Sequence, residues 1–464
     1  MRENKRAAFL SLGCKVNEYE TERLKESFHN AGYEIVLFSE QADVYVINTC
    51  TVTAEADRKS RQMVRRARKG NNEAVVVCAG CFSESAVKKL GADQLFKDTG
   101  ADIIVGNAAK ADIVGLVERF DKTRERIVYI PDINEKGLSY ERTDISTEGR
   151  SKVFEGDRIR AFLKIQDGCD RFCSYCLIPF ARGRSRSRDL NSIVSEAKDF
   201  FINGRREIVL TGINLSSYKG KDKEGLFDVA EVVINEINEL PGGDLFRLRL
   251  SSLEPNSIKE DEIKRLSQKS SLCPHFHLSL QSGSDTVLQR MNRHYDTKDF
   301  LTSVKILREY FDDPAITADI ICGFPGETES EFEETMRFAE TVGFAKIHVF
   351  PFSGREGTRA ASMDGQIKKS EKLYRTGKLI ELQDRLRAEY IERNIGREET
   401  VLIEERESAG DTCFYSGYTE RYIRACVPSD ALSHELSPGA LVKGASDKSR
   451  GNDCLIIDKD FIIL

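Results

Sequence analysis

The chain has 464 residues, of which 40% are hydrophobic, and a formal net charge of −6 from 70 Lys and Arg against 76 Asp and Glu. This length exceeds that of one ordinary domain, so two or three domains are expected. The negative charge excludes a protein that binds nucleic acid through a globally basic field, so any such partner must be met by local basic patches.

The first residues, MRENKRAAFL, run directly into apolar sequence without a signal-peptide core or cleavage site. No apolar run approaches the roughly 18 residues that a membrane span needs. We therefore expect a cytoplasmic protein with no membrane partner. In such a chain, the 12 cysteines favour metal or redox chemistry over a disulfide scaffold.

Residues 1–121 alternate short apolar runs with helical patterns. Strands are predicted at 7–14, 43–50, 74–81 and 101–106, and helices at 17–32, at 53–70 with Thr53 as N-cap, and up to about Phe120. Near-continuous apolar strands separated by helices predict a parallel sheet covered on both faces. We expect a doubly wound α/β domain here, followed by a charged connector at 122–154.

Residues 155–392 carry a second alternating series. Its strands are predicted at 161–166, 206–212, 245–252, 276–282, 316–323 and 346–352, and a charged helix is predicted near 370–393. About six β/α units predict a partial (β/α)6 barrel of the TIM type, with its chemistry in the loops after the strands. Residues 393–464 change to short strands with turns, which predicts a small all-β, OB-like barrel.

Three cysteines stand close together after the first strand of the second series, in GCDRFCSYC. Cys169, Cys173 and Cys176 provide three ligands, whereas structural zinc sites close with four. Thiolates at close spacing hold 4Fe–4S clusters, and three of them leave one iron open. The segment therefore favours an iron–sulfur cluster over zinc, with an iron that a substrate can chelate at the barrel mouth.

Three further cysteines follow predicted parallel strands of the first domain, in LGC, NTC and AGC. Because the carboxyl ends of parallel strands meet at one crevice, Cys14, Cys50 and Cys81 are expected to lie together. A second three-cysteine cluster site is the favoured interpretation, and ordinary buried cysteines are the alternative. The remaining cysteines are interpreted as packing residues: Cys78, Cys273, Cys322, Cys413, Cys426 and Cys454.

GCDRFCSYC resembles the signature of the radical S-adenosylmethionine superfamily. The resemblance implies that Cys169, Cys173 and Cys176 hold a 4Fe–4S cluster whose open iron is chelated by the amino and carboxylate groups of S-adenosylmethionine. Reduction would cleave this cofactor to a 5′-deoxyadenosyl radical, which can break an unactivated C–H bond.

The two triads in this order resemble the methylthiotransferase family of radical enzymes over essentially the whole chain. The resemblance implies an N-terminal methylthiotransferase domain whose cluster, on Cys14, Cys50 and Cys81, carries or donates sulfur. It further implies a radical domain and a C-terminal TRAM domain that binds RNA. The cofactors implied are two 4Fe–4S clusters and S-adenosylmethionine, used once as methyl donor and once as radical source.

Short segments resemble the branch of this family that acts on N6-threonylcarbamoyladenosine beside the tRNA anticodon: LGCKVNEYETE, IPFARGRSRSR, RLSSLEP and HVFPFSGREGTRAASM. The isopentenyladenosine branch more often has Gln-Met-Asn after the first cysteine, where this chain has Lys15, Val16 and Asn17. The resemblance implies methylthiolation of adenine C2. Isopentenyladenosine, a ribosomal-protein aspartate, and a non-catalytic RNA-binding protein with an Fe–S cluster or zinc are the alternatives.

Resemblance to the superfamily also implies contacts to S-adenosylmethionine beyond the iron. The loop with Thr211 and Asn214 stands where the amino group is usually met, and the backbone of Tyr175 would contact the adenine. Further candidate contacts are Ser251, Ser252, Gln281, Arg293, Asp319 and Phe324.

Basic and aromatic residues also indicate an RNA partner. After the cluster loop, the arginines that alternate with Gly and Ser favour phosphate contacts: Arg182, Arg184, Arg186 and Arg188. In the last domain, interleaved aromatic and basic residues are typical of barrels that stack bases: Phe414, Tyr415, Tyr418, Arg421, Tyr422 and Arg424. The implied partners are the tRNA anticodon stem-loop, an electron donor such as flavodoxin or ferredoxin, and a sulfur donor.

Overall fold

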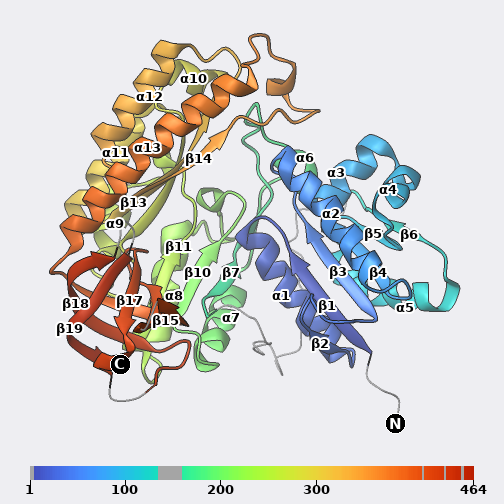
Figure 1. Cartoon of the computed structure of the whole chain (residues 1–464), viewed down its shortest axis with the longest axis horizontal. Coiled ribbons are helices and arrows are strands. Elements are labelled where there is room, and N and C mark those ends of the chain that lie inside the picture. Colours follow the sequence, from blue (N-terminus) through green and yellow to red (C-terminus); the bar gives the residue numbers. More distant parts are fainter. Residues whose placement is uncertain (1–4, 134–158, 410–411, 433–434, 451–453) are drawn as a thin grey trace.

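The computed structural model describes residues 5–133, 159–409, 412–432, 435–450 and 454–464 (Figure 1). An α/β domain, a second α/β domain and a β-barrel follow one another along the chain. Most of the connector predicted at 122–154 lies outside the described residues, which resume at residue 159. Within the described chain, no helix combines the length and the apolar character that a membrane crossing requires.

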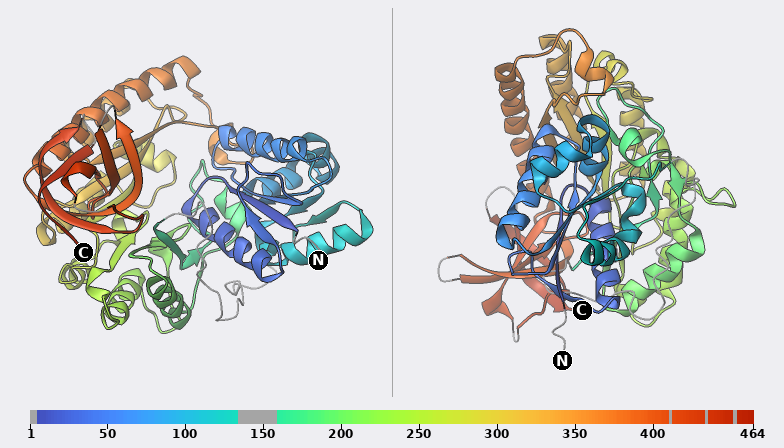
Figure 2. Two further views of the ribbon diagram at one scale, coloured as in Figure 1. Left: turned by 60° about the horizontal axis from the view of Figure 1, so that its bottom comes forward. Right: turned by 90° about the vertical axis from the view of Figure 1, so that its right-hand side faces the viewer.

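The N-terminal domain is built on a six-stranded sheet in the order β2-β1-β3-β4-β5-β6, and every neighbouring pair is parallel. The strands are β1 (Arg6–Ser11), β2 (Glu34–Val36), β3 (Val44–Thr49), β4 (Val75–Gly80), β5 (Ile103–Val105) and β6 (Ile127–Tyr129). Strands β3 and β4 are buried along their whole length because helices cover both faces of the sheet (Figure 2). The predicted parallel α/β sheet is confirmed.

The helices of this domain are α1 (Lys15–Asn30), α2 (Ala54–Gly70), α3 (Cys81–Leu90), α4 (Ala92–Thr99) and α5 (Ile113–Thr123). Thr53 caps α2 as predicted, because its hydroxyl accepts a hydrogen bond from the amide of Ala56 at 3.0 Å. The sequence pattern did not reveal α3 and α4. These two short helices are separated only by Gly91, so neither presents a long apolar repeat.

The second domain contains all six predicted strands: β7 (Ala161–Lys164), β10 (Glu207–Thr211), β11 (Arg247–Leu250), β12 (His275–Gln281), β13 (Ala315–Cys322) and β14 (Lys346–Pro351). They form two parallel three-stranded sheets, β7-β10-β11 and β12-β13-β14. Isolated bridges, Leu248 with Leu272 and Leu253 with Leu278, link the β11 segment to the β12 segment. The strands thus follow one another in chain order around a curved surface (Figure 1).

Helices cover the outer face of these strands: α7 (Leu190–Ile202), α8 (Leu226–Asn238), α9 (Glu260–Leu266), α10 (Asp285–Arg290), α11 (Thr297–Tyr310), α12 (Glu329–Val342) and α13 (Lys369–Asn394). Side chains alternate along the strands. In β12, Phe276, Leu278 and Leu280 pack into the core with the helices, whereas His275 and His277 point to the opposite, inner face. Polar groups are therefore concentrated inside the curve.

The last domain is a closed β-barrel in the order β15-β16-β17-β19-β18. Its strands are β15 (Glu398–Ala409), β16 (Thr412–Tyr418), β17 (Arg424–Pro428), β18 (Leu441–Arg450) and β19 (Cys454–Ile463). The barrel core includes Tyr390 and Ile391 from the end of α13, so the barrel packs directly on the second domain (Figure 1). The predicted β-rich C-terminal region is confirmed.

Candidate active site

Cys169, Cys173 and Cys176, here called the loop triad, lie in one turn-rich segment between β8 (Gln166–Asp167) and α6 (Ile178–Arg182). The amide of Cys169 donates to the carbonyl of Gly183 at 3.1 Å, which holds the segment against the end of α6. Gly168 has a φ of +70°, and a Cβ at this position would collide with the carbonyl oxygen of Arg184. Glycine is therefore required where the segment begins.

Three donors point at the sulfurs of the loop triad. Arg293 Nη1 lies 3.1 Å from Cys173 Sγ, Asn214 Nδ2 lies 3.9 Å from Cys169 Sγ, and the amide of Ile178 lies 3.4 Å from Cys176 Sγ. Burial raises the pKa of Cys176 to about 12. Hydrogen bonds to thiolate sulfur stabilise its negative charge and tune the potential of a bound cluster.

Cys14, Cys50 and Cys81, here called the strand-end triad, follow β1, β3 and β4 respectively. A Cβ on Gly13 would lie only 2.5 Å from Cys50 Sγ, so the first of these turns packs directly on the second cysteine. Burial raises the pKa of Cys50 to about 12, and the charges of Cys81 and Cys14 add to this effect. The structure thus brings the three thiols together in one crevice.

Cys78 stands in C-x-x-C spacing with Cys81 but does not join the strand-end triad. It is fully buried in the apolar layer on one face of the sheet, among residues such as Val76 and Ile104. Burial raises its pKa to about 12. Its place in the core agrees with the predicted packing role.

The donor set of both triads consists of three thiols. Thiolates around one zinc ion stand about 3.8 Å apart, given Zn–S bonds of about 2.3 Å in a tetrahedron. Among the described residues, neither triad brings its three Sγ atoms within 4.8 Å of one another. The donor set, three thiols with no fourth protein ligand in the triad, is the set expected for a cluster with one open iron.

Arg182 links the segment of the loop triad to the strand-end triad, whereas the sequence predicted a phosphate contact for it. It ends α6, directly after the loop triad, and its side chain is completely buried. Its Nε lies 3.3 Å from Cys81 Sγ, and its Nη2 donates to Asn17 Oδ1 at 2.6 Å. The segment that holds the loop triad therefore also supplies the guanidinium that contacts the strand-end triad. Nothing in the local sequence distinguishes this arginine from its neighbours.

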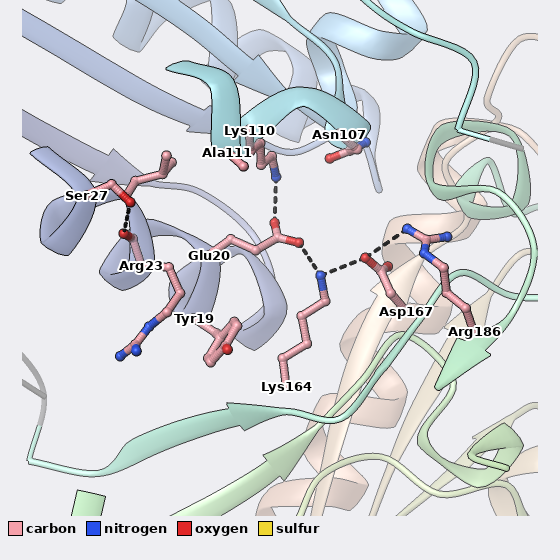
Figure 3. Close-up of a pocket in the computed structure, with 11 residues that line it drawn as sticks. Tyr19, Glu20, Arg23, Ser27, Asn107, Lys110, Ala111, Lys164, Asp167 and Arg186 are labelled. Atoms are coloured by element: carbon pink, nitrogen blue, oxygen red, sulfur yellow. Dashed lines mark hydrogen bonds and ion pairs between the residues drawn. The ribbon is translucent and has the colours of Figure 1, made fainter. Parts of the chain in front are cut away.

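Arg182 belongs to a buried network of charges, and Figure 3 shows the other members of this network: Glu20, Lys110, Lys164, Asp167 and Arg186. Glu20 binds Lys110 at 2.5 Å and Lys164 at 2.7 Å, while Asp167 binds Lys164 and Arg186. Burial alone would raise the pKa of Glu20, but Arg182, Lys110 and Lys164 outweigh it and hold that pKa well below its usual range. The network fastens α1 of the first domain to β7 of the second.

Several predicted cofactor contacts lie around the loop triad. Arg293 and Asn214 touch its sulfurs, and Tyr175 packs edge-on against Phe324 with ring centroids 6.5 Å apart. Thr211 and Ser251 are buried at the carboxyl ends of β10 and β11. Gln281 ends β12 with a φ of +71°, a conformation that a residue with a Cβ adopts at some cost and that often marks a functional position.

The other predicted contacts are placed differently. Asp319 belongs to a separate group on the inner face of β12–β14, where its carboxylate lies 3.3 Å from His277 Nε2 and close to His348. Phe324 is fully buried with Val287, Met291 and Phe352, so its side chain serves packing. Ser252 is exposed beside Ser251.

Some members of the basic and aromatic segments are buried, which contradicts the predicted phosphate and base contacts for those members. Arg186 pairs with Asp167, and Arg188 pairs with Glu196. Arg182 pairs with Glu20. Of these four arginines only Arg184 is exposed. In the last domain Phe414 and Tyr415 are buried. Tyr418 and Tyr422 stack at 4.8 Å, and Arg160 of the second domain lies over both rings.

A cavity lies where the three domains meet, and we call it the junction cavity. Its lining includes Lys15 of α1, His275 and His277 of β12, His348 of β14, Tyr390 of α13 and Tyr422 of the barrel. Burial, and then the nearby cations Arg160 and Arg249, lower the pKa of Lys15. The cavity is thus rich in groups that bind anions.

Comparison with known sequences gives two matches that follow the domain order. Residues 6–106 match a family described as uncharacterized protein family UPF0004, and residues 163–339 match the radical SAM superfamily. The threonylcarbamoyladenosine tRNA methylthiotransferase MtaB of Bacillus subtilis is 39% identical over 90% of this chain and 89% of its own. The protein of that name from Aquifex aeolicus is 36% identical over 86% and 92%.

A tRNA-2-methylthio-N(6)-dimethylallyladenosine synthase of Clostridium novyi is 33% identical over 88% of both chains. Among solved structures, the radical S-adenosylmethionine methyltransferase TsrM from Kitasatospora setae, with cobalamin and a [4Fe-4S] cluster bound, superposes with a TM-score of 0.56. The match covers 77% of each chain at 15% identity, so it shows a shared fold.

Proposed function

Since this chain belongs to the radical S-adenosylmethionine methylthiotransferases that modify tRNA, we propose that its substrate is N6-threonylcarbamoyladenosine beside the anticodon. The product is the 2-methylthio derivative. One observation carries the choice of substrate: the junction cavity is lined mainly by lysine, arginine, histidine and tyrosine side chains, and among its described lining residues only Ala345 and Ile423 have aliphatic side chains. A threonylcarbamoyl group offers a carboxylate and a hydroxyl to these side chains. A dimethylallyl group is a hydrocarbon, and it would leave the polar groups of the lining without hydrogen-bond partners.

Membership of the family implies two 4Fe–4S clusters and S-adenosylmethionine. The loop triad would hold the cluster that binds S-adenosylmethionine, and the strand-end triad would hold the second cluster. When bound, these groups supply the hydrogen-abstracting radical, the inserted sulfur and the methyl group, with one S-adenosylmethionine as radical source and one as methyl donor. An electron donor such as flavodoxin or ferredoxin and a sulfur donor complete the proposal.

The chain's own residues position these groups. Asn214 and Arg293 donate to the sulfurs of the loop triad, and Thr211, Ser251 and Gln281 offer polar contacts at the neighbouring strand ends. Tyr175 and the apolar group around Phe324 cover one side of the loop and exclude water from it. Asp319 would contact S-adenosylmethionine from the inner face of β13, where it lies beside His277.

We assign the domains as 1–121 for the second-cluster domain, 122–154 for the connector, 155–392 for the radical domain and 393–464 for an RNA-binding TRAM domain. The six-strand series supports a partial (β/α)6 barrel, and the closed β-barrel supports the TRAM assignment. A cytoplasmic location follows from the tRNA substrate.

The mouth of the site offers a surface for unstacked bases. Phe172 and Phe180 are exposed by 36% and 53%, and their rings meet edge to face at 5.7 Å. Arg184 lies over the Phe172 ring at 4.8 Å. Exposed aromatic rings beside an exposed arginine are suited to stacking single-stranded bases and holding their backbone.

Nucleoside mass spectrometry of tRNA from a deletion strain tests the substrate. We expect 2-methylthio-N6-threonylcarbamoyladenosine to disappear and its unmethylthiolated precursor to accumulate. If the 2-methylthio derivative of isopentenyladenosine disappears instead, the substrate of this protein is isopentenyladenosine in tRNA. An unchanged pool together with zinc, or with no cleavage of S-adenosylmethionine by the anaerobically purified protein, would rule out the radical mechanism.

A further inference from the structure

Lys15 makes no direct ion pair with a described residue, and the carboxylates of Asp319 and Glu18 favour its charged form. Its side chain is exposed into the junction cavity, and within the described parts of the chain no hydrogen bond or ion pair involves its ammonium group. Arg160 and Arg249, whose charges act on Lys15, are already paired with Glu404 at 2.9 Å and Glu207 at 2.8 Å. An unpaired cation in a concave site is a binding position for an anion.

The opposite wall of the cavity is also prepared for a polar ligand. His275 is 7% exposed, and its Nδ1 is buried without a hydrogen-bond partner in the described structure. His277 Nε2 lies 3.3 Å from the carboxylate of Asp319 and forms a hydrogen bond with it. His348 stands beside His277 with ring centroids 5.7 Å apart. An anionic group with further hydrogen-bonding atoms fits between Lys15 and these rings.

The position of Lys15 links this cavity to the proposed chemistry. Lys15 directly follows Cys14 of the strand-end triad, and the histidines that face it stand on the strands of the radical domain. A ligand held here therefore lies between the start of α1 in the first domain and strands β12 and β14 of the second. The cavity is enclosed by all three domains, so a substituent on a base can enter it more readily than a continuous phosphodiester chain.

We propose that Lys15 binds the carboxylate of the threonylcarbamoyl group and thereby determines which N6-substituted adenosine is accepted. This inference rests on the proposed function, and it assigns the recognition of the substrate's negative charge to one side chain. The pair is a charge-assisted contact in a site shielded from bulk water, where removal of one partner weakens binding strongly.

Binding to the anaerobically purified protein with both clusters tests this directly. Anticodon stem-loops are compared that carry threonylcarbamoyladenosine, its carboxylate methyl ester, or plain adenosine. We expect the native protein to bind the carboxylate form at least about tenfold more tightly than the ester. Equal affinity for these two stem-loops overturns the proposal without any change to the protein.

Lys15→Gln keeps a hydrogen-bonding side chain of similar length and removes the charge. We expect it to lose the preference for the carboxylate over the ester, and Lys15→Arg to restore most of it. Lys25→Gln is the matched control, because Lys25 lies on the same helix and pairs with Glu22 away from the cavity. It should bind like the native protein. Retention of the full preference by Lys15→Gln overturns the proposal.

S-adenosylmethionine also carries a carboxylate, and a second measurement distinguishes it. If Lys15 serves the cofactor, Lys15→Gln lowers S-adenosylmethionine affinity and its cleavage in the absence of RNA, which overturns the assignment to substrate. If the native enzyme methylthiolates only isopentenyladenosine, the proposed function itself has failed. If it methylthiolates threonylcarbamoyladenosine and Lys15→Gln does so equally well, only the role of Lys15 has failed.

Discussion

The loop triad and the strand-end triad contain the same three ligands but are built in opposite ways. Cys169, Cys173 and Cys176 are brought together by one short segment, whose geometry depends on Gly168 and on contacts within a few residues. Cys14, Cys50 and Cys81 come from the ends of three strands. The first triad is therefore a local structure, and the second exists only once the parallel sheet has formed.

The two triads are also not independent. Arg182 stands at the end of the segment that holds the loop triad, yet it donates to Cys81 of the strand-end triad. The carbonyl of Ala181 accepts from Asn107 Nδ2 at 2.8 Å, and Asn107 lies beside the same cysteine. Helix α6 thus belongs to the second domain and completes the site of the first. Substitutions in α6 are therefore expected to affect the strand-end triad as well as the loop triad.

The largest expected effect comes from removing one thiol from each triad. Cys173→Ala should abolish reductive cleavage of S-adenosylmethionine, whereas Cys50→Ala should retain cleavage and abolish the methylthio product. Each variant should keep about half of the iron, since three thiolates define each cluster. Iron and sulfide analysis with assay of 5′-deoxyadenosine measures both. Loss of all iron from either variant would show that the sites assemble together.

Arg182→Ala should give the next largest effect. It removes a fully buried cation that pairs with both Glu20 and Asp167, which costs about 3–5 kcal/mol of unfolding free energy. Urea unfolding measures this, and the spectrum of the strand-end cluster should change more than that of the loop cluster. Arg184→Ala is the control, because Arg184 is exposed and its loss should be nearly neutral. Equal effects of the two variants would contradict the linking role of Arg182.

Alanine substitutions at the two turn glycines, Gly168 and Gly13, should each affect one triad and leave the other largely unchanged. Gly168→Ala and Gly13→Ala each combine a positive φ with a close contact, so about 2–4 kcal/mol of destabilisation is expected at the respective site. Cluster occupancy should fall mainly at the loop triad for the first variant and at the strand-end triad for the second. Gly32→Ala, with a φ of +87° and no atom within 4 Å, measures the conformational cost alone.

A smaller, shared effect concerns pH. Burial raises the pKa of both Cys50 and Cys176 to about 12, so these thiols are protonated at neutral pH when no cluster is bound. Cluster assembly releases these protons, and apparent affinity should rise with pH by up to about tenfold per unit for each thiol. Reconstitution in competition with a chelator, between pH 7 and 8.5, measures this. A rise at one triad only would show that their thiols are not equally buried.

Much of the fold followed from local pattern. The apolar runs predicted the six strands of the second domain and most of the sheet of the first, and Thr53 was correctly placed as an N-cap. The strand-end position of three cysteines predicted their convergence, because parallel strands direct their carboxyl ends to one edge. These inferences needed only periodicity and chain direction.

Other features could not be predicted from spacing. Arg182 and Arg184 look alike in the sequence, yet one is fully buried beside Cys81 and the other exposed beside Phe172. Tyr418 and Tyr422 form a stack under Arg160 that no local pattern distinguishes from an RNA-binding surface. Each of these assignments depends on which domain packs against which face.

The sequence by itself determined the two sets of thiols and the order of the domains, because ligand spacing and strand periodicity are written within short segments. Only the tertiary structure decided how the triads are joined through Arg182 and where Lys15 stands. Those contacts connect residues from separate domains, and their energies depend on burial and on charges that become neighbours only when the domains pack.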